Sequence, residues 1–182
     1  MLAATPDDVL KFWFTDSTPK QWFMRSDAFD AAIRDTLGSL HERAAAGELD
    51  DWAATPRGAL ALMILLDQAP RNLHRGSSRA FASDPAALRH ARAALAAGFD
   101  TGLTDDERLF FYLPFEHSED LADQERCIEL CRTLATAQYV EYAERHRNVI
   151  ARFGRFPHRN AVLGRASTPE ELEFLKQPGS SF

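Results

Sequence analysis

The chain has 182 residues, a formal net charge of −6 and two cysteines. Apolar residues make up 45% and charged residues 26%, which predicts one globular domain over residues 1–182 and excludes disordered and disulfide-rich proteins. The longest strictly apolar run, residues 59–66, is far shorter than the roughly 20 residues that span a bilayer. The N-terminal residues have neither the basic start nor the apolar core of a signal peptide. We therefore expect a cytoplasmic protein without a membrane partner.

Basic residues concentrate in two stretches without acidic residues, 68–83 and 145–169, which together hold 9 of the 21 arginines and lysines. The acidity of the whole chain argues against a nucleic-acid partner. If the two stretches meet in space, they form a positive region that attracts a small anionic molecule or an acidic peptide. In the alternative, each arginine pairs with one of the surplus carboxylates and no positive region forms.

Helix-capping signals are dense along the chain. Thr5, Thr55, Asp84 and Thr168 each precede a proline, and such pairs are typical of a helix N-cap followed by the first helical residue. Gly47, Gly98 and Gly154 follow periodic stretches, as glycines do just beyond helix C-termini. These signals predict an all-α fold of about eight helices, at residues 6–14, 27–46, 56–69, 85–97, 105–113, 119–135, 137–153 and 169–176, with a frayed tail at 177–182.

One of these helices differs from the others in its hydrophobic pattern. Residues 60–66 are apolar on every side, which predicts a central helix with neighbours all round. The intervals between caps are unequal, so we expect an irregular helical array rather than a regular solenoid.

The first candidate site lies where the central helix ends, at Asp67, Gln68 and Arg71. A carboxylate that follows eight apolar residues enters the interior and needs a partner, and Arg71 lies one helical turn further on. Pro70 removes a backbone donor and frees carbonyls that Gln68 or Asn72 could satisfy. The cluster is either a polar binding site at a helix end or a buried ion pair that fixes a bend.

The second candidate is the pair Glu116 and His117, between two predicted helices. Imidazole titrates near neutral pH and a carboxylate can orient it, so the two are candidates for general acid–base catalysis. The alternative is a helix-start segment in which Ser118 is the N-cap and Glu119 favours the helix dipole.

The third candidate follows the helix predicted at 137–153. Arg155, His158, Arg159 and Asn160 alternate there with aromatic and turn residues, and such a loop can hold a carboxylate or phosphate. We count His158 among the catalytic candidates. The alternative is a C-terminal capping loop whose cations face helix ends and nearby acids.

Gln124 and His146 are polar residues on otherwise apolar helix faces, and with Glu116 and His117 they can form one internal polar pocket. A lone histidine on an apolar face is more often a satisfied core residue. Cys127 and Cys131 supply half a metal site at most, and the histidines lack metal-binding spacing. No nucleotide-binding glycine loop is present either. The sequence therefore predicts no metal and no cofactor.

These motifs resemble a bacterial family catalogued as domain of unknown function 924. The resemblance covers nearly the whole chain and rests on Phe12-Trp13-Phe14, Trp22-Phe23, Leu65-Leu66-Asp67-Gln68, Pro70-Arg71-Asn72, Pro114-Phe115-Glu116-His117-Ser118-Glu119, the stretch from Phe153 to Asn160, Leu163-Gly164-Arg165 and Ser167-Thr168-Pro169-Glu170-Glu171. It implies an all-α fold in the tetratricopeptide-repeat-like helical superfamily and no particular reaction. Ala69 departs from the family pattern, which has phenylalanine there, and leaves extra space beside Pro70.

The function itself stays open. The favoured hypothesis is a binding module with an anion site lined by arginine and histidine, formed by Asp67, Gln68, Arg71, Gln124, His146, Arg155, Arg159 and Asn160. The alternative is an enzyme that acts on a small anionic metabolite by histidine and glutamate acid–base chemistry, with His117, Glu116 and His158 as catalytic candidates. In a third interpretation these residues only stabilise the fold. The sequence does not determine the oligomeric state.

Overall fold

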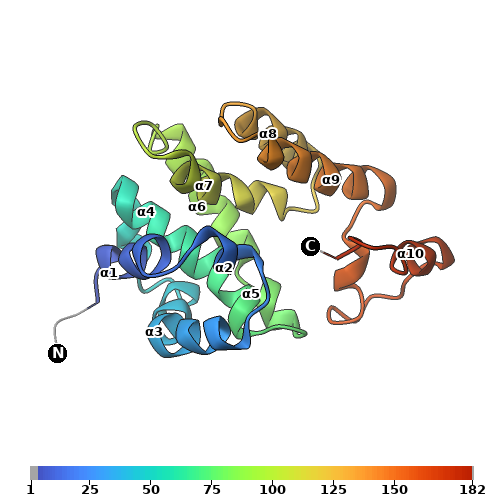
Figure 1. Cartoon of the computed structure of the whole chain (residues 1–182), viewed down its shortest axis with the longest axis horizontal. Coiled ribbons are helices and arrows are strands. Elements are labelled where there is room, and N and C mark those ends of the chain that lie inside the picture. The colour runs from blue at the N-terminus through green and yellow to red at the C-terminus, as the bar shows by residue number, and fades with distance from the viewer. Residues whose placement is uncertain (1–3, 182) are drawn as a thin grey trace.

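The computed structural model describes residues 4–181, and within that range it contains helices and no strand, which confirms the all-α prediction. Figure 1 shows an irregular array with α1 at one end and α10 at the other. The α-helices are α1 (Pro6–Leu10), α2 (Pro19–Phe23), α3 (Asp27–Ala45), α4 (Pro56–Met63), α5 (Ala69–Leu73), α6 (Asp84–Ala96), α7 (Asp105–Glu116), α8 (Leu121–Cys131), α9 (Ala137–Phe153) and α10 (Pro169–Phe174). Single π turns at Lys11–Thr15 and Ile64–Gln68, and 3₁₀ turns at Asp50–Ala54, Ser78–Phe81 and Pro157–Arg159, complete the described elements.

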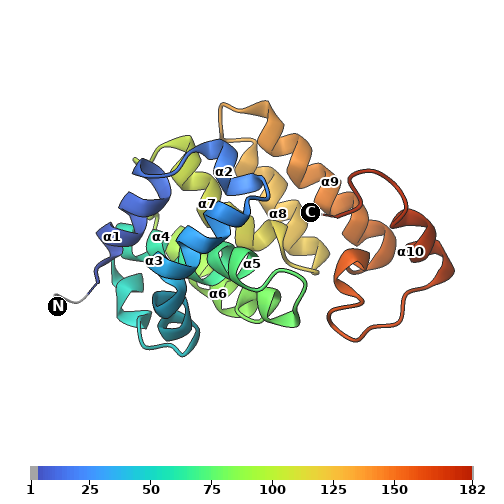
Figure 2. The same ribbon diagram turned by 60° about the horizontal axis from the view of Figure 1, so that its bottom comes forward.

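Helix α4 occupies the centre, as its apolar sequence predicts. It packs against α1, α6 and α7, and every residue from 58 to 70 is buried. Beyond it, α7, α8 and α9 pack against one another in chain order, and the segment after α9 carries α10 at the far end (Figure 2). No helix among the described residues is both long enough and apolar enough to cross a membrane.

The sequence predicts that the central helix ends at Ala69. In the structure it continues through Pro70 to Leu73. A π turn at Ile64–Gln68 widens the helix just before the proline, so the ring fits without breaking the helix. The carbonyls of Leu65, Leu66 and Asp67 then bind side chains: His41 Nδ1 at 2.8 Å, Ser83 Oγ at 2.6 Å and an Arg71 guanidinium nitrogen. Gln68 and Asn72, the partners that the sequence offers for these carbonyls, bind the carboxylates of Asp67 and Asp30 instead.

Other helix boundaries also differ from the prediction. Helix α7 passes through Pro114 and ends at Glu116 instead of at residue 113, and its whole last turn is buried. Helix α8 begins after Asp120, whose carboxylate accepts the Ala122 N–H, so Ser118 is not the N-cap. Helix α8 also ends at Cys131 rather than at residue 135. Helix α2 begins after a Thr18–Pro19 pair, the same cap signal as α1 and α4 carry, yet it is absent from the predicted set.

Several local predictions are confirmed. Thr104 and Thr168 form capping boxes with Glu107 and Glu171. Gly154 ends α9 in the left-handed conformation, with φ of 67°, where a side chain would be strained. The N-terminal aromatic residues are core packing, because Trp13 is fully buried and its ring meets that of Phe110 edge-on.

The C-terminal segment, expected to fray, turns back from α10 toward α9 (Figure 1). Ser180 is 5% exposed and its hydroxyl donates to the Leu175 carbonyl. Gly179 lies against Arg145 of α9, so closely that a Cβ there would meet the guanidinium. Residue 182 of the predicted tail lies outside the described residues.

Candidate functional site

Most of the predicted site residues meet in one place between the central helix, the end of α7, α9 and the loop after it. We call the following set the buried polar cluster: Asp67, Gln68, Arg71, Asp84, Glu116, His117, His146, His158 and Arg159. These residues come from segments that are widely spaced along the chain, and the fold brings the segments together.

Asp67 is the centre of the cluster. It lies on the π turn with 1% of its side chain exposed, and its carboxylate contacts His117 Nδ1 at 2.7 Å and Gln68 Nε2 at 2.5 Å. Arg71 approaches the same carboxylate at 3.4 Å, the pair predicted from the sequence. Burial alone would raise the pKa of Asp67, but the charge of Arg71 and the hydrogen bonds from His117 and Gln68 outweigh it and lower the pKa to about 2. Asp67 is therefore a fully buried carboxylate that stays ionised.

His117 caps the C-terminus of α7, and 13% of its side chain is exposed. Because its Nδ1 faces the ionised Asp67, that nitrogen carries the proton and Nε2 keeps the lone pair. Burial and then the charge of Arg71 lower the pKa of His117, against the pull of Asp67. A neutral imidazole oriented by a buried carboxylate is the arrangement that general-base catalysis requires.

Glu116 lies next to His146, with a carboxylate oxygen 3.5 Å from Nδ1 of the histidine. Burial, followed by the neighbouring charge of Asp67, raises the pKa of Glu116 to about 8. Burial lowers the pKa of His146 to about 3, although its Nδ1 also contacts the Tyr142 carbonyl at 2.9 Å. At neutral pH both groups are uncharged, so the contact is polar rather than a salt bridge. Glu116 is then a protonated acid inside the protein.

Arg71 and Arg159 converge on Asp84, where the two basic stretches meet. Arg71 binds the carboxylate through two nitrogens at 2.9 and 3.0 Å, whereas Arg159 reaches it only at 3.4 Å. The Arg159 guanidinium carbon lies 4.5 Å from the ring centres of both Phe81 and Phe156. Burial, and then the charge of Arg71, lower the pKa of Arg159 to about 10. Arg159 Nε is buried and has no hydrogen-bond partner among the described residues.

The third candidate motif divides between two places. His158 and Arg159 join the buried polar cluster, but Arg155 and Asn160 turn toward Glu171 of α10. Arg155 binds Glu171 at 2.6 and 2.8 Å, and Asn160 donates to the same carboxylate at 3.3 Å. Arg155 and Asn160 therefore belong to a separate set of paired charges rather than to the expected common site.

Gln124 also differs from its expected role. Its side-chain amide donates to the carbonyls of Glu116 and Ser118 at 2.6 and 2.7 Å, and more weakly to that of Phe115. These carbonyls lie at the C-terminal end of α7, where backbone acceptors have no intrahelical donor. Gln124 therefore closes the helix end and holds Glu116 and His117 in position without joining the cluster.

The alternative interpretation of the basic stretches holds for most other arginines. Ion pairs of varying exposure join Arg75 to Asp30, Arg79 to Glu42, Arg147 to Glu125, Arg152 to Glu170 and Arg165 to Glu119. No continuous positive surface is formed by these residues, because each has an acidic partner within 3 Å.

Comparison with known proteins agrees with the resemblance seen in the sequence. The profile of the family described as "Bacterial protein of unknown function (DUF924)" matches residues 9–179. The chain belongs to this family. A solved structure, "Structure of Protein of Unknown Function ATU0120 from Agrobacterium tumefaciens", is similar to the chain with 44% sequence identity and a TM-score of 0.90, and the match covers 94% of this chain and 96% of that one. The comparison with curated proteins gave no match.

Two residues at the cluster in this DUF924 chain are absent from the predicted site. Asp84 is expected to be a helix N-cap, but Ser83 takes that position and Asp84 binds the two arginines instead. Phe81 faces the Arg159 guanidinium. One signal is present in the sequence: Asp84 is the first acid after the basic stretch 68–83 and therefore a natural partner for its arginines.

Proposed function

We propose that the buried polar cluster binds a small anionic molecule, with Arg159 and Arg71 as its cationic contacts. The observation that carries the proposal is the incomplete pairing of Arg159. Its Nε has no hydrogen-bond partner among the described residues, its ion pair with Asp84 is 3.4 Å long, and it shares that carboxylate with Arg71. A buried guanidinium offers five donors, and a planar carboxylate or a phosphate would satisfy those that are weakly paired.

The position of the cluster favours a small molecule over an extended acidic peptide. The side chain of Arg159 is 8% exposed, and those of Arg71, Asp84 and His117 are 13 to 19% exposed. We propose that an anion would reach the cluster past these partly exposed groups. A peptide could enter only with a terminal carboxylate, whereas a small carboxylate or phosphate could enter whole.

The test is a thermal-shift screen of the purified protein with inorganic phosphate, nucleotides, sugar phosphates and small carboxylates. A ligand present at one hundred times its dissociation constant adds about 2.7 kcal/mol to the free energy of unfolding. We expect the shift to disappear in Arg159→Met, which keeps an apolar chain between Phe81 and Phe156. Arg152→Met is the matched control, because Arg152 is exposed and pairs with Glu170 away from the cluster. Equal shifts in both variants would refute the proposal.

A second candidate function is acid–base catalysis on the same anion. It is favoured by the pairing of His117 with Asp67 and by the raised pKa of Glu116, which together put a proton acceptor and a proton donor in the same cluster. His117 Nε2 would take a proton from the bound molecule, and Glu116 would supply one.

This candidate is tested once the screen has identified a ligand. We expect His117→Gln to retain the ligand-induced shift and to lose chemical conversion of the ligand, as measured by mass spectrometry. His90→Gln is the control, because His90 pairs with Asp50 outside the cluster. Recovery of the ligand unchanged from the wild-type protein would leave binding as the function and reject catalysis.

We also propose two properties that the sequence analysis predicts: a tetratricopeptide-repeat-like architecture and a cytoplasmic location. The first is supported by consecutive helices that pack pairwise from α6 to α9, as in arrays of helical hairpins. The second is supported by Cys127 and Cys131, which are free thiols although their sulfurs lie 3.9 Å apart.

A further inference from the structure

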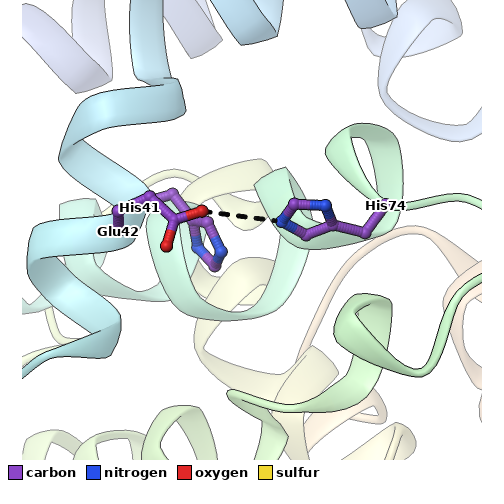
Figure 3. Close-up of side chains that lie close together, drawn as sticks. All are labelled: His41, Glu42 and His74. Carbon is purple, nitrogen blue, oxygen red and sulfur yellow. Dashed lines mark ion pairs between the residues drawn. The ribbon is translucent and has the colours of Figure 1, made fainter.

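A second group of ligand-type side chains lies outside the buried polar cluster. His41 and Glu42 are consecutive residues of α3, and His74 caps the C-terminus of α5 (Figure 3). One ligand atom from each residue lies within 4.8 Å of the other two. The rings of the two histidines are 5.6 Å apart, and His74 Nε2 is 3.9 Å from a Glu42 oxygen. The sequence motifs select none of these residues, because the two histidines are far apart in the chain and match no recognised metal-binding spacing.

The protonation state of His41 is fixed by the fold. Its Nδ1 lies 2.8 Å from the Leu65 carbonyl, which can only accept a hydrogen bond, so Nδ1 carries the proton. Nε2 therefore keeps the lone pair that binds a metal. A backbone carbonyl that holds the second ring nitrogen is the usual support of a metal-binding histidine, because it sets both the tautomer and the ring orientation.

His74 is prepared for the same role in another way. Its side chain is 15% exposed, and Nε2 is buried without a hydrogen-bond partner among the described residues. Burial, followed by the charge of Arg79, lowers the pKa of His74. With the proton on Nδ1, the lone pair of Nε2 is left for a metal, next to the Glu42 oxygen.

We propose that His41, Glu42 and His74 bind a divalent transition metal of the zinc class. Two imidazole nitrogens and one carboxylate oxygen are a ligand set that zinc accepts, and three protein ligands leave a fourth position for water. Ligand atoms around tetrahedral zinc lie roughly 3.4 Å apart, which follows from bond lengths near 2.1 Å. The Glu42 side chain is 58% exposed and therefore free to close the remaining distance.

Arg79 is the group that competes with the metal. It donates to Glu42 Oε1 at 2.6 Å, and its side chain is 59% exposed. Arg34 also adds positive charge near His74. A metal must either displace Arg79 or use the second oxygen of Glu42, so removal of Arg79 is expected to strengthen binding.

The experiment uses the full chain treated with a chelator and then dialysed. Zinc chloride is titrated by calorimetry, and cobalt(II) absorption reports a tetrahedral site with nitrogen and oxygen ligands. We expect one zinc ion per chain, with binding at least tenfold weaker in His74→Gln and in Glu42→Gln. His90→Gln and Glu48→Gln are the matched controls, and Arg79→Gln is expected to bind about threefold tighter.

Circular dichroism of each metal-free variant verifies that it is folded. If His74→Gln fails to fold, the exposed Glu42→Gln carries the test. Absence of zinc binding by the wild-type chain, or equal binding by the wild type and both ligand variants, would overturn the proposal. The second outcome would point to another site, such as the thiols of Cys127 and Cys131.

Discussion

The two charge-dense regions of the molecule use the same residue types and differ in how completely those residues are paired. In the loop after α9, Glu171 accepts hydrogen bonds from Arg155, Asn160 and the Thr168 N–H. Glu119 binds Arg165 through two nitrogens at 2.7 and 3.0 Å and also accepts the Phe156 N–H. Each of these two carboxylates has several donors, and Arg155 and Arg165 each have a carboxylate of their own.

The buried polar cluster is less completely paired. Asp84 serves two arginines, Arg159 Nε has no hydrogen-bond partner among the described residues, and Glu116 holds a proton because burial and Asp67 disfavour its charge. Fully paired charges stabilise a loop, whereas incompletely paired buried charges cost stability and are retained where they serve another purpose. The difference between the two regions, rather than the number of charges in either, is what indicates the candidate site.

The largest effect is expected from Asp67→Asn. The substitution removes the buried negative charge that faces Arg71 and His117, and an uncompensated buried cation costs about 3 to 5 kcal/mol. Urea unfolding at pH 7 measures the loss. A change below about 1 kcal/mol would mean that the cluster does not depend on this carboxylate.

A smaller loss is expected from Glu119→Ala in the fully paired region. Its carboxylate accepts two bonds from Arg165 and one from the Phe156 N–H, and their removal costs about 2 kcal/mol. We expect any anion-induced thermal shift to survive this substitution. Loss of the shift would show that the two regions act as one unit through Phe156, whose ring contacts Arg159.

The third prediction concerns pH. Folded Glu116 keeps its proton up to about pH 8, whereas an ordinary glutamate loses it near 4.5, so the folded state binds more protons between these values. The free energy of unfolding contributed by Glu116 therefore decreases as pH rises through this window. His146 and His158, with pKa values lowered to about 3 and 4, act in the opposite direction but only below their ordinary value of 6.5.

Between pH 6.5 and 8 the contribution of Glu116 is therefore not opposed by these histidines. About 1.5 pH units corresponds to about 2 kcal/mol. We expect Glu116→Gln to remove this decrease, as measured by urea unfolding at both pH values. An equal decrease in wild type and variant would assign it to another group.

The sequence predicted the fold class, the buried central helix and most of the residues in the cluster. Capping signals and periodicity are local, so they located α3, α9 and the capping box of Thr104 well. The path of the central helix through Pro70 was not predictable, because the π turn depends on side chains from distant segments, His41 and Ser83. For the same reason the sequence assigned Arg155 and Arg159 to one common site. In the structure they pair with carboxylates in different regions.

The smallest effect is expected from Arg126→Ala. Arg126 pairs with Glu129 at 2.9 Å on the surface of α8, and both side chains are more than half exposed. Water screens such a pair, so its removal is expected to change the free energy of unfolding by less than about 0.5 kcal/mol. Urea unfolding at low and high salt measures the change, with Glu129→Ala as the matched variant. A loss of about 2 kcal/mol would equal the loss expected for Glu119→Ala. The stability of an ion pair would then not depend on how many donors surround its carboxylate, and the two charge-dense regions would not differ in this respect from ordinary surface pairs.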